Sequence, residues 1–171
     1  MISGGIFGPK LSGKSTLAKH LSIAYWTKKK MRSLVLDPHG EVWGPQAWRT
    51  DNEQKFWNAV WKTRHCLVIV EEAAATIRRE RELVPVFTRL RHNCHKLLVI
   101  GHDGTDLLPV MRRQFDTVFL FLQPDEAVKL WKQDLPSVKG LDAASGLGQY
   151  EFLRGELFKP AVKMRLRYNG G

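Results

Sequence analysis

One short motif near the start of the chain constrains its fold more than any other feature. The pattern G-x-x-x-x-G-K-[ST] is matched at every fixed position by Gly8-Pro9-Lys10-Leu11-Ser12-Gly13-Lys14-Ser15. A strand candidate, Ile2 to Phe7, precedes the motif, and a helical pattern from Lys14 to Lys30 follows it. This strand–loop–helix context distinguishes a phosphate-binding loop from a chance Gly-Lys-Ser sequence.

Each part of the loop has a chemical purpose. The glycines let the backbone curl so that successive N–H groups face a phosphate, and the helix beginning near Gly13 adds its positive dipole end. Lys14 can reach the terminal phosphates, and the Ser15 hydroxyl can ligate Mg²⁺. We therefore expect ATP and Mg²⁺ as cofactors, with nucleotide-binding residues Gly8, Pro9, Lys10, Leu11, Ser12, Gly13, Lys14, Ser15 and Thr16.

The rest of the chain alternates between apolar runs and helical patterns. Strands are predicted at Ser33–Leu36, Cys66–Val70, Lys96–Ile100 and Thr117–Leu122, and helices at Glu53–Arg64, Leu83–Asn93 and Asp125–Gln133. This alternation predicts one α/β domain over residues 1–171, with a mainly parallel sheet flanked by helices. A C-terminal β-hairpin is predicted from Tyr150–Arg154 and Ala161–Tyr168, which flank Gly155 and Pro160.

Two adjacent carboxylates follow the apolar run Leu67 to Val70. The carboxyl ends of parallel strands line the ligand crevice, so both acids are expected near the phosphates. Glu71 would then hold Mg²⁺ through water, and Glu72 would orient or deprotonate the attacking water. Because adjacent strand residues point to opposite faces, both can serve only if the strand ends at Glu71. The alternative is that Glu72 merely begins the next loop.

A third polar cluster, Gly101 to Asp106, follows the strand predicted at Lys96–Ile100. A polar side chain directly after a central strand can contact the terminal phosphate and report its loss. His102 is the best-placed candidate for this role. An ordinary hydrogen-bonded loop histidine is an equally weighted alternative.

Charge and composition exclude several classes of protein. The chain has 27 Lys+Arg against 17 Asp+Glu, a net charge of +10, which favours a polyanionic partner such as nucleic acid or an anionic membrane face. A solvated basic surface is the alternative. The segment Arg78-Arg79-Glu80-Arg81 could touch nucleic-acid phosphates, and an ordinary charged helix start is the alternative for it. No apolar run approaches the ~20 residues of a membrane span, and we find no secretory signal.

Taken in order, these segments resemble the FtsK/HerA superfamily of DNA-pumping ATPases, and most of all the genome-packaging ATPases of viruses and phages with internal membranes. The loop resembles Walker A, and Glu71-Glu72 resembles the Walker B acids. Residues 34–41 are similar to the second strand of the family and the D-P-x-G-E turn that follows it. Three further segments match the family. Residues 89–93 resemble its basic helix, residues 101–107 resemble its segment T-Q-R-P-x-D-L, and residues 112–117 resemble its stretch R-x-x-x-D-T. The departures are Glu71 for Asp and His102 for Gln.

The resemblance implies a RecA-like P-loop NTPase fold and a homo-oligomeric ring, usually a hexamer, with ATP between subunits. It also implies DNA, double-stranded in kind, and viral capsid or vertex proteins as partners, in the host cytoplasm or the virion. An arginine of one subunit would complete the neighbour's site, and such a finger can contribute ~10³–10⁵ in rate. Arg89 and Arg91 are the first candidates and Arg112 and Arg113 the next; a surface or DNA-facing role is the alternative for each. The predicted catalytic residues are Glu72, Lys14, His102, Arg89 and Arg91.

Two competing functions remain open from the sequence. A small-molecule P-loop kinase, similar to nucleoside kinases, would use Arg78-Arg79 and Arg112-Arg113 in its lid or acceptor pocket. The paired acids argue against a kinase, because a base that activates water is of no use to it. A basic module that binds nucleotide without turning it over is the third hypothesis.

Overall fold

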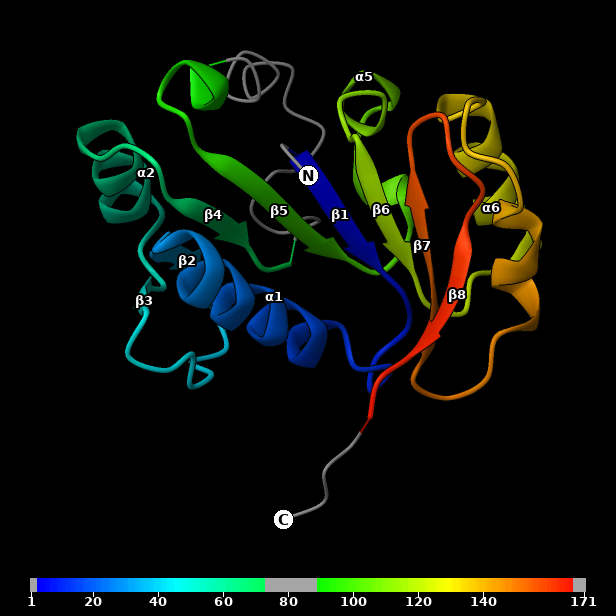
Figure 1. Ribbon diagram of the computed structural model, residues 1–171, viewed down its shortest axis with the longest axis horizontal. Coiled ribbons are helices and arrows are strands. Elements are labelled where there is room, and N and C mark those ends of the chain that lie inside the picture. The colour runs from blue at the N-terminus through cyan, green and yellow to red at the C-terminus, as the bar shows by residue number, and fades with distance from the viewer. Residues whose placement is uncertain (1–2, 73–88, 168–171) are drawn as a thin grey trace.

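The computed structural model describes residues 3–72 and 89–167 (Figure 1). Within these residues one eight-stranded sheet has the order β3-β2-β4-β5-β1-β6-β7-β8. The strands are β1 (Ser3–Phe7), β2 (Ser33–Leu36), β3 (Ala47–Thr50), β4 (Leu67–Val70), β5 (Lys96–Gly101), β6 (Thr117–Leu120), β7 (Glu151–Glu156) and β8 (Val162–Arg165). Pairing is parallel from β3 to β6 and antiparallel through β7 and β8. The expected mainly parallel sheet with a hairpin is confirmed.

Helices cover both faces of this sheet. The α-helices are α1 (Lys14–Lys29), α2 (Glu53–Lys62), α5 (Pro109–Arg112) and α6 (Asp125–Asp134), and two 3₁₀ segments are η2 (Gly104–Asp106) and η3 (Leu141–Gly146). Residues 89–92 are also helical, and the remainder of the helix predicted at Leu83–Asn93 lies outside the described residues. None of the described helices is long and apolar enough to span a membrane.

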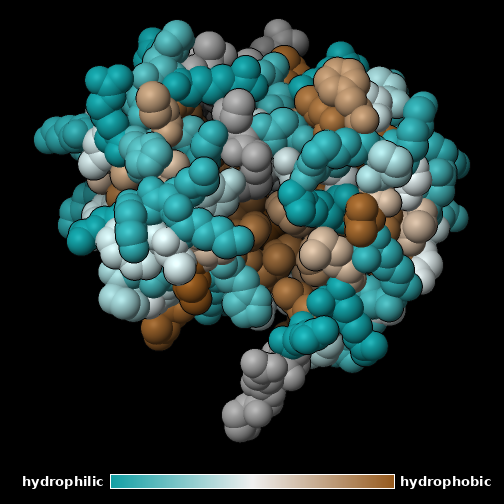
Figure 2. All heavy atoms as spheres, viewed as in Figure 1, coloured by the Kyte–Doolittle hydropathy of each residue, from teal (hydrophilic) through white to brown (hydrophobic). Residues whose placement is uncertain are grey.

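Side chains of the strands point alternately to the two faces of the sheet, and each face has its own hydrophobic core. Leu67 and Ile69 of β4 pack on the side of α1, whereas Val68 and Val70 pack on the side of α2 and α6. All four are buried, as expected for a strand covered on both faces. Helix α2 buries Phe56 and Val60 in the core on its side of the sheet, because residues four apart lie on the same face of a helix. Between α1 and β8, apolar side chains show at the surface among mostly polar ones (Figure 2).

Strand β3 was not expected from the sequence. It is the edge strand beside β2, and its side chains are half-buried or exposed, so it has no apolar run. Strand β2 has the expected bounds, and the other strand bounds differ from expectation by one to three residues. The largest difference is β8, which ends at Arg165 rather than at Tyr168.

The strand order reverses at β1, and this reversal marks the carboxyl ends of the parallel strands as the place where a ligand would bind. Strand β1 lies between β5 and β6, and α1 carries the chain from β1 past β5 and β4 to β2. The arrowheads of β1, β4 and β5 point to the same edge (Figure 1). Ligands of open α/β sheets bind at such a point, outside the carboxyl ends of the strands. The three polar clusters of the sequence all follow strands that end there.

Candidate functional site

The loop between β1 and α1 has a backbone that its glycines make possible. Gly13 caps α1 with φ 103° and ψ 14°, in the region that glycine adopts most easily. A Cβ at Gly13 would lie 2.6 Å from Cδ1 of Leu166, and one at Gly8 would lie 2.5 Å from Cβ of Phe121. Packing therefore requires both glycines, in addition to any need to approach a phosphate.

Lys14 folds back over the loop that precedes it. Its Nζ donates to the carbonyl oxygens of Gly8 and Pro9, each at 2.8 Å. Burial lowers the pKa of Lys14, while the carboxylates of Glu71, Glu72 and Asp106 act in the opposite direction. The ammonium group of Lys14 thus bonds to two carbonyl oxygens of the loop and also interacts with three carboxylates.

The chain turns sharply at the two acids after β4. The strand ends at Val70, and Glu72 has a φ of 54°, in the left-handed region. Glu71 and Glu72 therefore line the same cavity of about 260 Å³, together with Lys14, Ser15 and His102. The strand thus stops before the two acids, which is the condition for both of them to share a site.

Glu71 is the more buried of the two acids, at 6% exposure. Burial raises its pKa to about 7, although a hydrogen bond with Ser15 and the charge of Lys14 act to lower it. A carboxylate and a hydroxyl at the edge of a phosphate loop are oxygen donors suited to Mg²⁺, and a cation would relieve the cost of the buried charge. Within the described residues no three His, Cys, Asp or Glu side chains form a metal cluster. The two oxygen donors, from Glu71 and Ser15, fit an ion that takes its other ligands from water and phosphate.

Glu72 lies between two histidines. The Nε2 of His39 is 3.2 Å from Oε1 of Glu72, and the Nε2 of His102 is 3.8 Å from the same oxygen. The structure thus brings the predicted His102 to the predicted acid. It adds His39, whose role the sequence did not suggest even though the residue stands in the turn resembling D-P-x-G-E.

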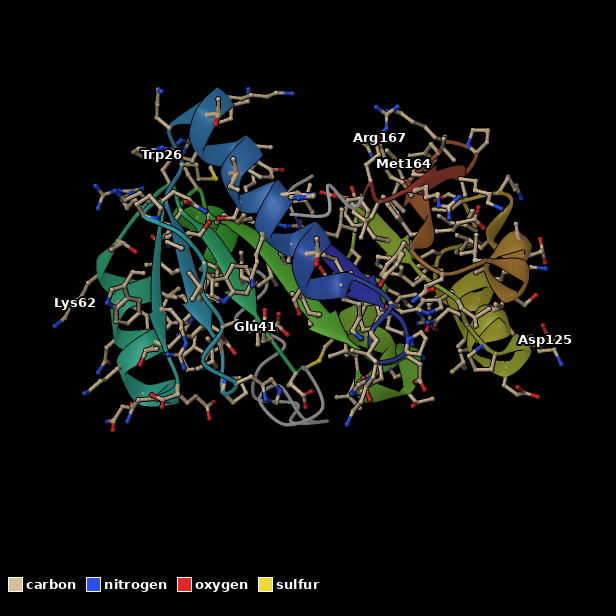
Figure 3. The ribbon with its side chains drawn as sticks, turned by 90° about the horizontal axis from the view of Figure 1, so that it is seen from below. Trp26, Glu41, Lys62, Asp125, Met164 and Arg167 are labelled. Atoms are coloured by element: carbon tan, nitrogen blue, oxygen red, sulfur yellow. The ribbon has the colours of Figure 1, made fainter. Side chains whose placement is uncertain are left out.

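A buried carboxylate organises that turn. Asp37 accepts hydrogen bonds from the backbone N–H groups of His39 and Glu41, each at 2.8 Å, and from Nε1 of Trp43 at 3.1 Å. Burial alone would raise the pKa of Asp37, but these bonds and Arg49 lower it overall. Glu41 lies beside α1 (Figure 3), where it pairs with Lys19 at 2.8 Å.

The loop that carries His102 is held by two side chains. Oδ2 of Asp106 accepts the backbone N–H of His102 at 2.7 Å. Arg112 is buried and donates to the carbonyl oxygens of Gly104 at 2.5 Å and Leu107 at 2.6 Å. The expectation that Arg112 could reach a neighbour's site is therefore wrong, because its guanidinium is committed to its own loop. Arg113 is 57% exposed in its side chain and stays a candidate.

Arg89 and Arg91 lie away from this site within one chain. Arg89 and Arg91 are exposed and stand on the helical residues 89–92, which precede β5 at the other edge of the sheet (Figure 1). The structure therefore does not bring them to Lys14 of the same chain. The basic segment with Arg78, Arg79 and Arg81 lies outside the described residues.

A second cavity opens on the other side of the loop, and the sequence did not point to it. It measures about 350 Å³ and is lined by Thr16 with Glu41, Gln149 and Tyr150, among others. Tyr150 stands just before β7 with a φ of 62°. Its nearness to the loop depends on the packing of the hairpin, so no local pattern could have indicated it.

The fold and this arrangement of loop and acids define the class of P-loop NTPases. No family model and no curated protein matches the chain. Among solved structures, the genome packaging NTPase B204 from Sulfolobus turreted icosahedral virus 2, in complex with sulfate, has a TM-score of 0.78 and 20% identity over 99% of this chain and 98% of that one. B204, the DNA-packaging ATPase from Sulfolobus turreted icosahedral virus, matches with a TM-score of 0.74 and 18% identity over 97% and 98%.

A more distant structure shares the same architecture. The N-terminal domain of zonular occludens toxin from Neisseria meningitidis has a TM-score of 0.62 and 12% identity, over 96% of this chain and 93% of that one. The fold expected from the resemblance to packaging ATPases is thereby confirmed over nearly the whole chain.

Proposed function

We propose that the chain is an ATP-hydrolysing motor that translocates DNA and packages a viral genome into a capsid. One observation carries the proposal: Lys14, Ser15, both acids and His102 line a single cavity of about 260 Å³. The same fold is found in B204, a genome packaging NTPase solved in complex with AMPPCP and with ATP-gammaS.

In this proposal ATP lies across the phosphate loop. Its phosphates contact the backbone of residues 8–16 and the ammonium group of Lys14. The nucleoside occupies the cavity of about 350 Å³ lined by Thr16, Gln149 and Tyr150. Ser15 and Glu71 would hold Mg²⁺, which would supply positive charge to neutralise the phosphates.

Hydrolysis then uses Glu72 as the base. As a water oxygen attacks the γ-phosphorus, Glu72 takes its proton, and the bond from that phosphorus to the bridging oxygen breaks to leave ADP and phosphate. Lys14 stabilises the charge that develops on the phosphate oxygens. His102 contacts the terminal phosphate, and Arg89 or Arg91 enters from a neighbouring subunit.

The assembly proposed is a homo-oligomeric ring, a hexamer, that grips double-stranded DNA and docks on capsid or vertex proteins, in the host cytoplasm or on the virion. The net charge of +10 supports a polyanionic partner, since each subunit would add its positive field to the channel. The location of Arg89 and Arg91 away from their own Lys14 is compatible with a role across subunits.

The test is steady-state ATP hydrolysis by the purified protein, with and without double-stranded DNA, across a salt series. We expect DNA to raise turnover, and added salt to weaken that effect as protein–phosphate contacts are screened. Substituting Lys14→Ala or Glu72→Gln should lower hydrolysis by at least ~10². Turnover that ignores DNA at every salt concentration would remove the translocase from the proposal.

The same assay separates the two alternatives. Phosphate transfer to a nucleoside by a monomer would favour the kinase, for which the position of Glu72 beside Lys14 gives no support. Turnover near zero in both the wild type and Glu72→Gln, with tight nucleotide binding, would favour the binding module.

A further inference from the structure

We infer that His39 is a positioning residue for Glu72: its imidazole holds the carboxylate in the orientation from which it takes the proton of the attacking water. The inference rests on the proposed hydrolytic function. It is drawn from the contact of 3.2 Å between Nε2 of His39 and Oε1 of Glu72.

Glu72 needs such a partner because of where it stands. The residue follows the end of β4 with a φ of 54°, so the strand ladder no longer sets the direction of its side chain. Its side chain is 32% exposed. A glutamate has three side-chain torsions, and a base must lie within hydrogen-bond reach of the proton it removes. The Nε2 of His39, 3.2 Å from Oε1, is close enough to restrict these torsions by donating a ring N–H.

The partner is itself held in place by the sheet. Strands β2 and β4 pair in parallel with Leu36 opposite Val70, and the N–H of Glu71 donates to the carbonyl of Leu36 at 2.9 Å. The turns that follow these two strands therefore lie side by side. Asp37 accepts the N–H of His39 at 2.8 Å, so the turn that presents the imidazole is anchored by a buried carboxylate.

The two histidines beside Glu72 are not equivalent. His39 is closer to Oε1, at 3.2 Å against 3.8 Å for His102, and the two come from different strand ends, after β2 and after β5. Only His102 also lines the neighbouring cavity of about 490 Å³ beside Pro9. We assign the positioning of Glu72 to His39 and contact with the terminal phosphate to His102, with the second oxygen of Glu72 directed at the water.

The experiment measures kcat for ATP and the Kd of a fluorescent ATP analogue in three variants. In His39→Ala we expect kcat to fall about tenfold, a part of the ~10²–10⁴ that a general base contributes, with Kd unchanged. His39→Gln keeps an N–H donor at a similar reach and should recover most of the lost kcat. His20→Ala is the matched control, since His20 is exposed on α1, and it should leave both quantities unchanged.

A double variant makes the test specific to Glu72. If His39 acts through Glu72, then His39→Ala should cost nothing further in a Glu72→Gln background, because residues that act as a unit are not additive. Wild-type kcat in His39→Ala, or a Gln variant no better than Ala, would overturn the inference. A different result, full turnover in Glu72→Gln alone, would instead overturn the proposed hydrolytic role of Glu72.

Discussion

Arg112 and Asp134 form a buried ion pair, with 2.6 Å between Nε and Oδ2 and side chains only 5% and 2% exposed. The pair ties α6 to the loop that carries His102, because Arg112 also donates to two carbonyl oxygens of that loop. Arg112, which the sequence suggests as a candidate for a neighbouring subunit's site, therefore stabilises a loop of its own subunit.

The first prediction concerns this buried ion pair. Substituting Arg112→Leu leaves the Asp134 carboxylate buried without its main partner, so we expect a loss of ~3–5 kcal/mol in the free energy of unfolding. Arg113 also contacts Asp134, with 2.9 Å between Nε and Oδ1, but its side chain is 57% exposed and Arg112 would still pair with the carboxylate, so Arg113→Ala should cost less than Arg112→Leu. Urea unfolding followed by circular dichroism measures both. Equal losses in the two variants would contradict the assignment of Arg112 to the interior.

The second prediction concerns the backbone of the phosphate loop. In Gly13→Ala the methyl group meets Leu166 at 2.6 Å on a residue with a φ of 103°. The left-handed conformation alone costs ~1–2 kcal/mol, so we expect a lower Tm and weaker nucleotide binding. Gly146→Ala is the control, since nothing lies within 4 Å of its Cβ position. A Gly13→Ala protein as stable as the control would show that the loop relaxes freely.

The third prediction concerns the ammonium group over the loop. Lys14→Ala removes the charge that faces Glu71, Glu72 and Asp106, and we expect ATP turnover to fall by ~10²–10³, as for other electrostatic groups at a reaction centre. Because the side chain is not part of the hydrophobic core, Tm should change little. Lys28→Ala, on the exposed last turn of α1, is the charge-matched control and should keep full turnover.

The fourth prediction is a pH dependence of stability without nucleotide and with a chelator present. Burial raises the pKa of Glu71 from 4.5 to about 7, so between these values the folded chain holds a proton that the unfolded chain has released. Rising pH therefore destabilises the fold through this window, by ~3 kcal/mol once pH exceeds the folded value. Glu71→Gln should lose this dependence and be the more stable protein above pH 7.

Urea titrations at several pH values test this difference between the wild type and Glu71→Gln. The exposed Glu126→Gln on α6 is the control and should keep the pH profile of the wild type. Parallel profiles for the wild type and Glu71→Gln would mean that the carboxyl of Glu71 titrates as it does in water.

The fifth prediction addresses the arginines beyond the site. If Arg89 or Arg91 acts on a neighbouring subunit, its alanine variant should lose ~10³–10⁵ in turnover. Mixing that variant with inactive Lys14→Ala subunits should restore part of the activity, because a mixed ring contains sites with both groups intact. No restoration in mixtures that form rings would leave these arginines without a role across the interface.

Local patterns predicted much of this fold. The phosphate loop and the buried strand Leu67–Val70 were recognisable because their signals are contiguous in sequence. Strand β3 was missed because an edge strand with exposed side chains has no apolar run. The contact between His39 and Glu72 depends on the pairing of β2 with β4, which no single segment encodes.

Burial was the other quantity that the sequence did not reveal. Arg112 and Arg113 are adjacent and chemically alike, yet one side chain is 5% exposed and the other 57%. Both contact Asp134 of α6, and the difference in burial follows from the loop, since Arg112 also donates to the carbonyl oxygens of Gly104 and Leu107. The same holds for Tyr150, whose place beside the phosphate loop follows from the hairpin rather than from its neighbours in sequence.

The contact between Gly13 and Leu166 joins two segments that are far apart in sequence. Leu166 follows β8, its N–H donates to the carbonyl of Tyr150 at 2.9 Å, and its side chain fills the space that a Cβ on Gly13 would need. The C-terminal hairpin and the phosphate loop therefore pack against each other, so a shift of β8 would move an atom that lies against the backbone of the nucleotide site.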